Sequence, residues 1–329
     1  MKQPIQRLAA IAVVIATLPF AFPAAAQTQQ AYPNKSIKVV IAFPPGGPTD
    51  AIGRVVLNAL AQKIGQPMLI DNRPGAGGSV AADIVAKSPA DGYTLFYASS
   101  TIATAPEMYK RPDMNPAKFL APVACTVSVP FALLISSSLP PKDVQSLVGL
   151  IKQSPNKFFQ GSSGNGSPDH LTGVLFGKEL GLQFTHVPYK GNAAALTDLV
   201  GGNINFMFAG ALQSALPLVQ DGRLRVLAVT SAKRSSLLPD VPTLNETVIK
   251  GFDAGTWQAL VAPMNTPPEV IRLLNTKMNE VLADPVIQKQ LQLQGAEPIA
   301  GTAVQCGSFI QQEYVRWSEV IKVNKVQAD

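Results

Sequence analysis

The sequence predicts an α/β fold of two lobes, each built around a doubly wound sheet. Short apolar runs alternate with amphipathic stretches along the chain, which is the pattern of strands alternating with helices. The length of 329 residues suits two domains of ordinary size. Because no Gly/Ser-rich linker divides the chain, we expect two lobes joined by strands that cross between them twice.

The N-terminus has the layout of a cleaved secretory signal peptide. Lys2 and Arg7 precede an apolar run over residues 8–22, which is followed by Ala24-Ala25-Ala26. This small-residue ending predicts that residues 1–26 are removed and that the mature protein is periplasmic. The alternative is a membrane anchor, but the run is shorter than the about 20 residues that span a bilayer.

The expected elements follow from the spacing of apolar residues. The apolar run 37–43 ends at Pro44, which predicts a buried strand. Ile52, Val56 and Leu60 then recur at helical spacing. The elements expected in the first half of the chain are strand 37–43, helix 49–64, strand 67–72, helix 79–87, strand 93–98, strand 123–135 interrupted at Pro130, helix 144–153, strand 157–160 and helix 168–180.

The second half continues the same alternation. Val270, Leu274 and Met278 lie on one face of a predicted helix. The expected elements are strand 183–187, helix 193–200, strand 203–208, helix 212–220, strand 223–229, strand 256–262, helix 268–282 and a last long helix 304–323. Such alternation favours parallel sheets, whose strand-to-helix loops share one edge.

Composition excludes several classes of function. The formal charge is +6 with only 15% charged residues, and the basic residues form no dense patch. Nucleic-acid binding therefore has little support. The high apolar content indicates a compact globular protein. We expect a monomer with no cofactor.

Two cysteines, Cys125 and Cys306, lie far apart in the chain. In an exported protein an even count of cysteines suggests a disulfide. The alternative is a pair of buried free thiols. Two cysteines and two histidines cannot form an ordinary structural zinc site without carboxylates.

Three glycine-containing loops lie at junctions between a predicted strand and the following helix: residues 44–50, 73–79 and 161–167. In open α/β sheets, ligands bind at the carboxyl ends of strands. Glycine permits close approach of the backbone, and the following helix starts present free N–H groups. Such loops can hold a carboxylate without a buried cation. The alternative is that they are only tight turns and helix caps.

Nucleotide-binding and catalytic motifs do not match. The chain contains neither G-x-x-x-x-G-K-[ST], nor G-x-G-x-x-G, nor G-x-S-x-G. A hydrolase or lyase needs a base near a nucleophile, and the sequence offers only His170 close to Ser167. An exported hydrolase or lyase therefore stays open as an alternative function. His186 is interpreted as a structural strand residue, Arg73 as a loop-bracing ion-pair partner, and Trp257 as either core or a cleft wall.

In seven sequence segments the chain resembles the Bug-type extracytoplasmic receptors, the substrate-binding proteins of tripartite tricarboxylate transporters. These segments occur in the same order as in the family and span nearly the whole mature chain. Each is a weak signal alone, but the ordered set is specific for the family. They are residues 43–50, 72–78, 89–95, 161–171, 186–191, 224–230 and 238–243.

The resemblance implies a Venus-flytrap fold of the type II periplasmic-binding class. Lobe one would combine residues 27–128 and 253–329, and lobe two would be residues 129–252, with hinge strands near Val129 and Thr256. Such receptors bind small carboxylates, including amino acids, dicarboxylates and aromatic acids. They are not enzymes, and they deliver the solute to membrane permease subunits. A sensory receptor that signals to a membrane kinase is an alternative that the sequence does not separate from uptake.

Site residues carried over from the resemblance form one wall on each lobe. The lobe-one wall is expected to comprise Phe43, Pro45, Gly46, Gly47, Thr49, Asp50, Ser99 and Thr101. The lobe-two wall is expected to comprise Ser162, Ser163, Gly166, Ser167, His170, Tyr189, Asn192, Phe208 and Gly210. Residues 113–116 match no ligand motif, so the distal end of the solute is unassigned.

Overall fold

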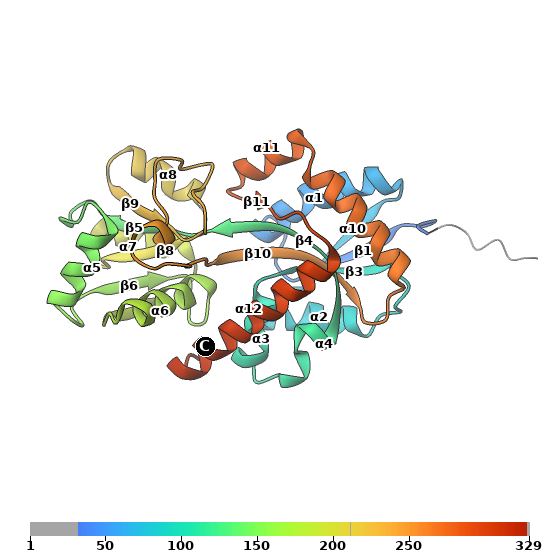
Figure 1. The fold of residues 1–329 in the computed structure, drawn as a ribbon, viewed down its shortest axis with the longest axis horizontal. Helices are drawn as coiled ribbons and strands as arrows, with labels where there is room; N and C mark the ends of the chain where they lie inside the picture. Colours follow the sequence, from blue (N-terminus) through green and yellow to red (C-terminus); the bar gives the residue numbers. More distant parts are fainter. Residues whose placement is uncertain (1–31, 211, 328–329) are drawn as a thin grey trace, which may run out of the picture. The chain divides into compact units, whose positions relative to one another are not determined.

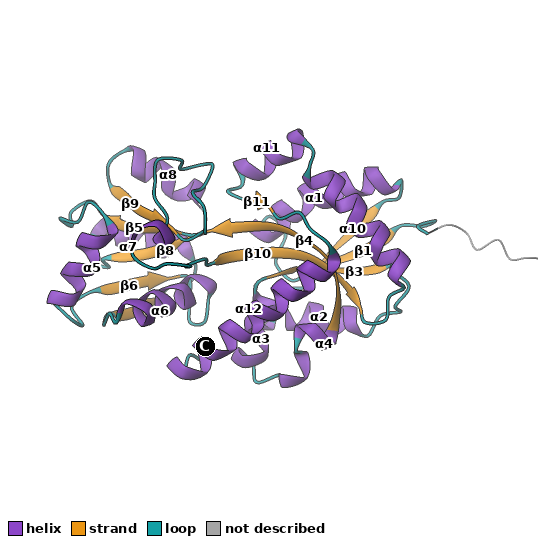
Figure 2. Cartoon of the chain, in the orientation of Figure 1, coloured by secondary structure: helices purple, strands orange, loops and turns teal. Residues whose placement is uncertain are grey.

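The computed structural model describes residues 32–210 and 212–327, which build two β-sheets flanked by helices (Figures 1 and 2). The described residues belong to one compact unit. The predicted signal peptide lies outside the described residues. The two-sheet α/β architecture confirms the predicted fold class.

The first sheet has six strands in the order β11-β4-β10-β3-β1-β2. Its strands are β1 (Ile37–Ile41), β2 (Met68–Asn72), β3 (Thr94–Ser99), β4 (Leu120–Pro130), β10 (Gly255–Pro263) and β11 (Glu297–Pro298). β1 pairs in parallel with β2 and β3, whereas β10 runs antiparallel to β3 and β4. This sheet is therefore mixed, and its parallel part is the β3-β1-β2 end.

The second sheet has five strands in the order β7-β6-β8-β5-β9. Its strands are β5 (Ala132–Ser136), β6 (Phe159–Ser162), β7 (Thr185–Pro188), β8 (Phe206–Ala209) and β9 (Leu224–Val229). β6 pairs in parallel with β7 and β8, and β5 runs antiparallel to β8 and β9. In both sheets the strands that enter from the other sheet break the parallel order.

Helices connect most of the parallel strands and cover the sheets (Figure 2). Those among the first-sheet strands are α1 (Pro48–Ile64), α2 (Ser79–Ala86), α3 (Thr101–Met108), α4 (Pro116–Phe119), α10 (Pro268–Leu282), α11 (Pro285–Leu293) and α12 (Ala303–Asn324), with 3-10 turns η1 (Ala76–Gly78) and η2 (Pro112–Met114). Those among the second-sheet strands are α5 (Val144–Gln153), α6 (Pro168–Leu180), α7 (Asn192–Gly201), α8 (Leu212–Gln220) and α9 (Leu244–Thr247).

The chain passes between the sheets at two places that are tied together. β4 leads into β5 through Phe131, and the return passes through Ala254 into β10. The buried Thr230 bonds to both passages: its hydroxyl donates to Ala254 O (2.6 Å) and accepts from Phe131 N–H (2.8 Å). These bonds fix the two passages beside each other. The predicted lobe boundaries and hinge positions remain predictions.

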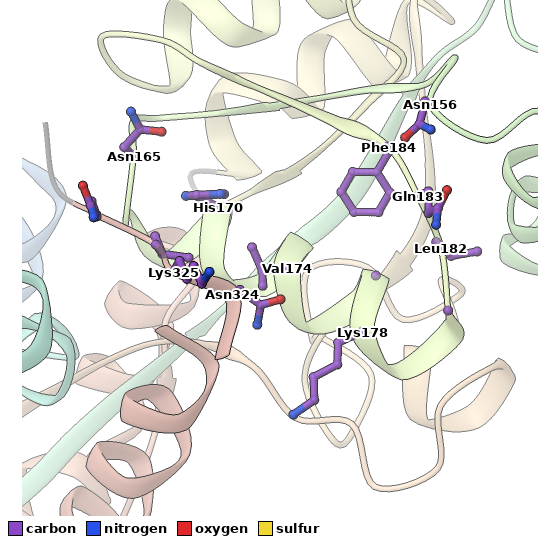
Figure 3. A pocket seen from close by; sticks show the side chains of 14 residues that line it. Asn156, Asn165, His170, Val174, Lys178, Leu182, Gln183, Phe184, Asn324 and Lys325 are labelled. Atoms are coloured by element: carbon purple, nitrogen blue, oxygen red, sulfur yellow. The ribbon is translucent and has the colours of Figure 1, made fainter. Parts of the chain in front are cut away.

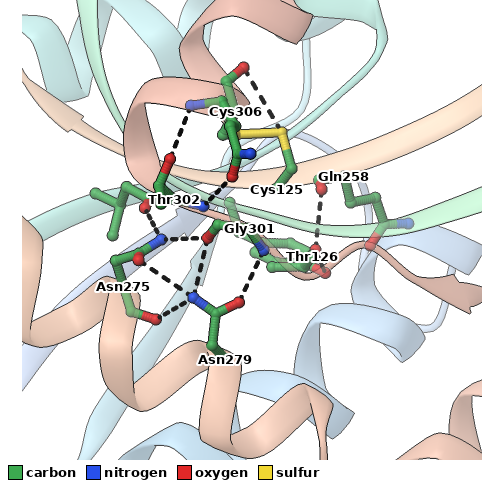
Figure 4. The surroundings of a disulfide bond; sticks show 11 residues. Cys125, Thr126, Gln258, Asn275, Asn279, Gly301, Thr302 and Cys306 are labelled. Atoms are coloured by element: carbon green, nitrogen blue, oxygen red, sulfur yellow. Dashed lines mark hydrogen bonds between the residues drawn. A yellow bond between two sulfur atoms is a disulfide. The ribbon is translucent and has the colours of Figure 1, made fainter.

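A disulfide joins Cys125 on β4 to Cys306 in the first turn of α12, with their Cα atoms 5.2 Å apart (Figure 4). The predicted bridge is thus present. Beside it, Asn275 of α10 donates to Val123 O (2.8 Å) and Gly301 O (3.0 Å). The bridge and these bonds hold the start of α12 against the first sheet.

A buried carboxylate ties the middle of α12 to β10. Glu313 Oε2 accepts hydrogen bonds from the indole N–H groups of Trp257 and Trp317, both at 3.0 Å. Arg316 Nη1 donates to the other oxygen at 3.3 Å. Trp257 is 3% exposed and packs in the core. It also lines a cavity beside Glu313 and Arg316.

The described part of the chain holds no helix long and apolar enough to cross a membrane. Within those same residues, no group of three or more His, Cys, Asp or Glu side chains could hold a metal ion.

Candidate functional site

Three helices begin at the carboxyl ends of neighbouring strands without a side-chain cap. α1 follows β1, α2 follows the β2 loop and α3 follows β3, and the N-cap residues Gly47, Gly78 and Ser100 make no side-chain cap hydrogen bond. Elsewhere α5, α6, α9, α11 and α12 have side-chain caps, whereas α7 and α10 also lack one. Because β3, β1 and β2 are adjacent and parallel, the uncapped starts share one edge of the sheet. Their N–H groups and dipoles favour an anion there.

The start of α2 lies against both of its neighbours. A Cβ atom built on Gly78 would lie 3.2 Å from Ala42 Cβ and 3.5 Å from Thr101 Oγ1. Gly78 also has φ +97°, a backbone conformation that L side chains rarely adopt. Glycine is therefore required here, and it lets the end of β1 and the starts of α2 and α3 meet.

Asp50 organises the first loop from within. Its carboxylate accepts from Gly46 N–H (2.9 Å), from Arg54 Nε (2.8 Å) and from Asn72 Nδ2 (2.9 Å). Asn72 also donates to Phe43 O at 2.8 Å. Burial works to raise the pKa of Asp50, but the hydrogen bonds from Arg54, Gly46 and Asn72 outweigh it and lower the pKa. The carboxylate therefore positions the loop, and its oxygens are already used by these hydrogen bonds.

We expect Asp50→Ala to lower the free energy of unfolding at neutral pH by about 2–3 kcal/mol, since charge-assisted hydrogen bonds to a buried carboxylate are lost. The folded-state pKa of Asp50 is depressed. The stabilisation is therefore complete above the unfolded-state pKa and is lost as the pH falls through the folded-state pKa.

Urea denaturation of wild type and variant between pH 7 and pH 2 measures this difference. The control is Asp113→Ala, which removes an exposed ion-pair partner of Arg111 and should change stability far less, because solvent screens an exposed pair. An equal loss in both variants, or a difference that does not shrink in acid, would contradict the assignment.

The other predicted lobe-one residues lie around the same edge. Ser99 Oγ and Thr101 Oγ1 are 2.9 Å apart, and between them the hydroxyl of Ser100 is buried without a hydrogen-bond partner. Pro45 and Gly46 are exposed, and Phe43, Gly47 and Thr49 are half-buried. Ser100 lies within the predicted wall segment, residues 99–101, but was not singled out as a contact residue.

In the loop 162–167 of the second sheet, side chains of the loop and of the first turn of α6 accept hydrogen bonds from the loop amides. Ser163 donates to Asp169 through both its N–H (2.7 Å) and its hydroxyl (2.6 Å). Gly164 N–H donates to Ser162 Oγ at 3.2 Å, and Ser167 caps α6 by accepting from His170 N–H at 3.3 Å. These amides are therefore not open donors. The first amides of α2 and α3 are also used, since Ser79 N–H donates to Ala76 O and Thr101 N–H donates to Ser99 Oγ at 3.4 Å. Asp169 lies within the predicted wall segment, residues 162–170, but was not singled out as the residue that bonds to the loop.

The start of α7 lies beside this loop. Its N-cap residue, Gly191, has no side chain to cap the helix, and its φ is +100°. Gly191 N–H donates to Ser163 O at 3.2 Å. The side-chain oxygen of Asn192 is buried without a partner. Tyr189 donates its hydroxyl to Asp198 at 2.7 Å. Burial and then this bond raise the pKa of Tyr189 to about 12, so the phenol stays neutral. The start of α7 therefore lacks a side-chain cap, as do those of α1, α2 and α3.

Phe208 and Gly210 lie near the passage between the sheets. Phe208 is fully buried, with its ring 5.5 Å from that of Phe176. A Cβ atom on Gly210 would lie 2.8 Å from the ring of Phe131. The side chain of Phe208 belongs to the core here, so a contribution to a site would come from its backbone.

A groove of about 850 Å³ runs along α6, opposite the C-terminal end of α12 (Figure 3). Asn165, His170 and Lys178 lie on one side, and Asn324 and Lys325 lie on the other. Of the predicted site residues, His170 lines this groove. Nearby, a Cβ atom on Gly166 would lie 1.9 Å from Met108 Cε, so α3 of the first-sheet region touches the loop 162–167.

The structure thus gathers the predicted residues into two groups. The residues of loops 43–50 and 99–101 meet at one edge of the first sheet, and those of 162–170 and 189–192 meet at the edge of the second. Arg73 pairs with Asp71 at 2.9 Å, in line with its predicted bracing role. Their part in binding a solute remains a prediction.

A family comparison agrees with this geometry. The family model described as the tripartite tricarboxylate transporter family receptor matches residues 52–326. The chain is 36% identical over 318 residues to Protein BugT of Bordetella pertussis. This alignment covers 96% of each sequence.

Solved structures agree as well. An R. palustris protein solved with adipate is 35% identical and aligns with a TM-score of 0.75, covering 90% of this chain and 99% of that one. MatC from Rhodopseudomonas palustris, solved with bound malate, is 30% identical with a TM-score of 0.71, covering 88% and 100%. The chain therefore belongs to the tripartite tricarboxylate transporter receptor family.

Proposed function

We propose that this protein is a periplasmic receptor that captures a small carboxylate between its two lobes and delivers it to the permease of a tripartite tricarboxylate transporter. The observation that carries the proposal is the set of three uncapped helix starts, α1, α2 and α3, along one sheet edge. Helix starts of this kind stabilise a carboxylate through N–H groups and aligned dipoles.

The binding step requires no bond to break. A solute that contacts both lobes favours the state in which the lobes are closed on it, and the population shifts by the difference in affinity between the two states. Two relatives support the choice of solute class, because their structures were solved with adipate and with malate. Among neighbouring cations, Arg54 and Arg73 are paired with Asp50 and Asp71. Main-chain donors therefore fit the role better than these side chains.

Thermal denaturation in the presence of adipate, malate, amino acids and aromatic acids tests the proposal. At a concentration 100-fold above Kd, a bound acid stabilises the folded state by about 2.7 kcal/mol and raises Tm. The diamides of adipate and malate are the matched neutral controls and should leave Tm unchanged. A panel of acids without any shift, or equal shifts from acids and diamides, would count against carboxylate capture.

A further inference from the structure

Two imidazole rings hold the loop 162–167 at its two ends. His170, in the first turn of α6, and His186, on β7, stack with ring centroids 3.6 Å apart and planes 5° from parallel. The Oγ atom of Ser162 lies 2.6 Å from His186 Nε2. Gly166 N–H donates to His170 Nδ1 at 3.0 Å. The stacked pair therefore fixes both the first residue of the loop and its glycine turn.

The bond to Gly166 sets the protonation state of His170. A backbone N–H is always a donor, so Nδ1 can accept only while it carries no proton. Protonation of Nδ1 would place two donors face to face and break the bond. If both rings were charged, two cations would also be stacked 3.6 Å apart. The loop conformation in this structure thus requires a neutral His170.

The charged groups near the pair come from several elements. On α6, Asp169 bonds to Ser163, and Lys178 lines the same groove as His170. Lys325, after the end of α12, lines the groove from the other side. On β6, the residue in register with His186 is the uncharged Gln160. Charged groups of both signs therefore adjoin His170 in sequence or line the same groove.

We infer that His170 is a positioning residue whose neutral imidazole keeps the loop 162–167 in its solute-binding shape, so that solute affinity falls when His170 takes up a proton. The inference rests on the proposed function, because it takes this loop as part of the solute site. One proton must leave His170 before Gly166 can bond to it. Affinity should therefore fall about tenfold per pH unit below the titration midpoint of His170.

The first measurement needs no solute. NMR of the free protein from pH 8 to pH 5 follows the His170 ring and the Gly166 amide. We expect the Gly166 amide shift to change with the same midpoint as His170, and its hydrogen exchange to accelerate below it. If the chemical shift and hydrogen exchange of the Gly166 amide do not change as His170 titrates, the inference is overturned.

The second measurement is calorimetric titration of adipate and malate into wild type and two variants over the same pH range. His170→Asn keeps a side-chain oxygen to accept from Gly166 but does not titrate, whereas His170→Ala offers no acceptor. Since the acids themselves titrate, the informative quantity is the affinity ratio of wild type to His170→Asn. We expect that ratio to fall with pH, and His170→Ala to bind weakly throughout.

The two hypotheses fail in different ways. An affinity ratio that stays constant with pH overturns the role of His170 while leaving carboxylate capture intact. Absence of binding by either acid to wild type at pH 7.5 counts against the proposed function for these solutes. The NMR titration of Gly166 tests the link between His170 protonation and the loop conformation without any solute.

Discussion

Replacement of Glu313 by alanine is expected to lower the free energy of unfolding by about 3–5 kcal/mol. Glu313 is 8% exposed, and its carboxylate accepts hydrogen bonds from the indoles of Trp257 and Trp317. Alanine would leave two buried N–H donors without a partner, and the guanidinium of Arg316 would lose its bond to Glu313. The variant would also loosen α12 from β10, because this carboxylate joins the two elements.

Guanidinium chloride denaturation monitored by tryptophan fluorescence measures the loss. Glu280→Ala is the matched control, since Glu280 also lies on a helix and pairs with a cation, Lys277, but is exposed. That control should change stability by at most about 1 kcal/mol. A loss below about 1 kcal/mol in Glu313→Ala would show that the indole bonds do not hold α12.

Removal of the disulfide is expected to have the next largest effect on stability, a loss of about 2–5 kcal/mol. The bridge spans 181 residues of sequence, and such a cross-link restricts the unfolded chain strongly. The double variant Cys125→Ala with Cys306→Ala is the suitable change, because both positions are buried and serine would bury unpaired hydroxyls.

Chemical denaturation of this double variant is compared with wild type under oxidising and reducing conditions. Wild type should lose stability when a reductant is added, and the double variant should not respond. If oxidised wild type and the double variant unfold at the same denaturant concentration, the bridge does not stabilise the fold.

Much of the fold followed from apolar periodicity, and its limits have physical causes. The strand direction of β10 was not predicted, because alternation of strands and helices carries no information on a strand that returns from the other sheet. α3 was not predicted because Pro106 lies within it. It forms nevertheless, packed against α12 and with most of its residues buried. α11 was also not predicted, although Asp284 before Pro285 is a visible helix start.

The candidate site shows a similar division. Glycine-containing loops at strand ends were visible in the sequence, and the structure places them at the sheet edges. What the pattern could not show is which loop amides are already used. Asp169 occupies the N–H of Ser163, and His170 occupies that of Gly166, because both side chains fold back onto the loop. Side-chain direction decides this, and it follows from packing rather than from spacing.

The role of His186 was predicted only as structural. Its position in a short strand gave no sign that it would stack on His170 across the sheet edge and approach Ser162. Residues 24 positions apart meet there because β6 and β7 are paired in parallel. Contacts of this kind depend on strand pairing, which a single sequence does not specify.

The central claim is that main-chain N–H groups at uncapped helix starts, rather than cationic side chains, hold the carboxylate of the solute. A crystal structure of the protein with a bound organic acid tests it most directly. We predict a solute carboxylate oxygen about 2.7–3.2 Å from N–H groups that begin α1, α2 or α3. A carboxylate held instead by Lys178 or Lys325 in the groove beside α6 would contradict the claim.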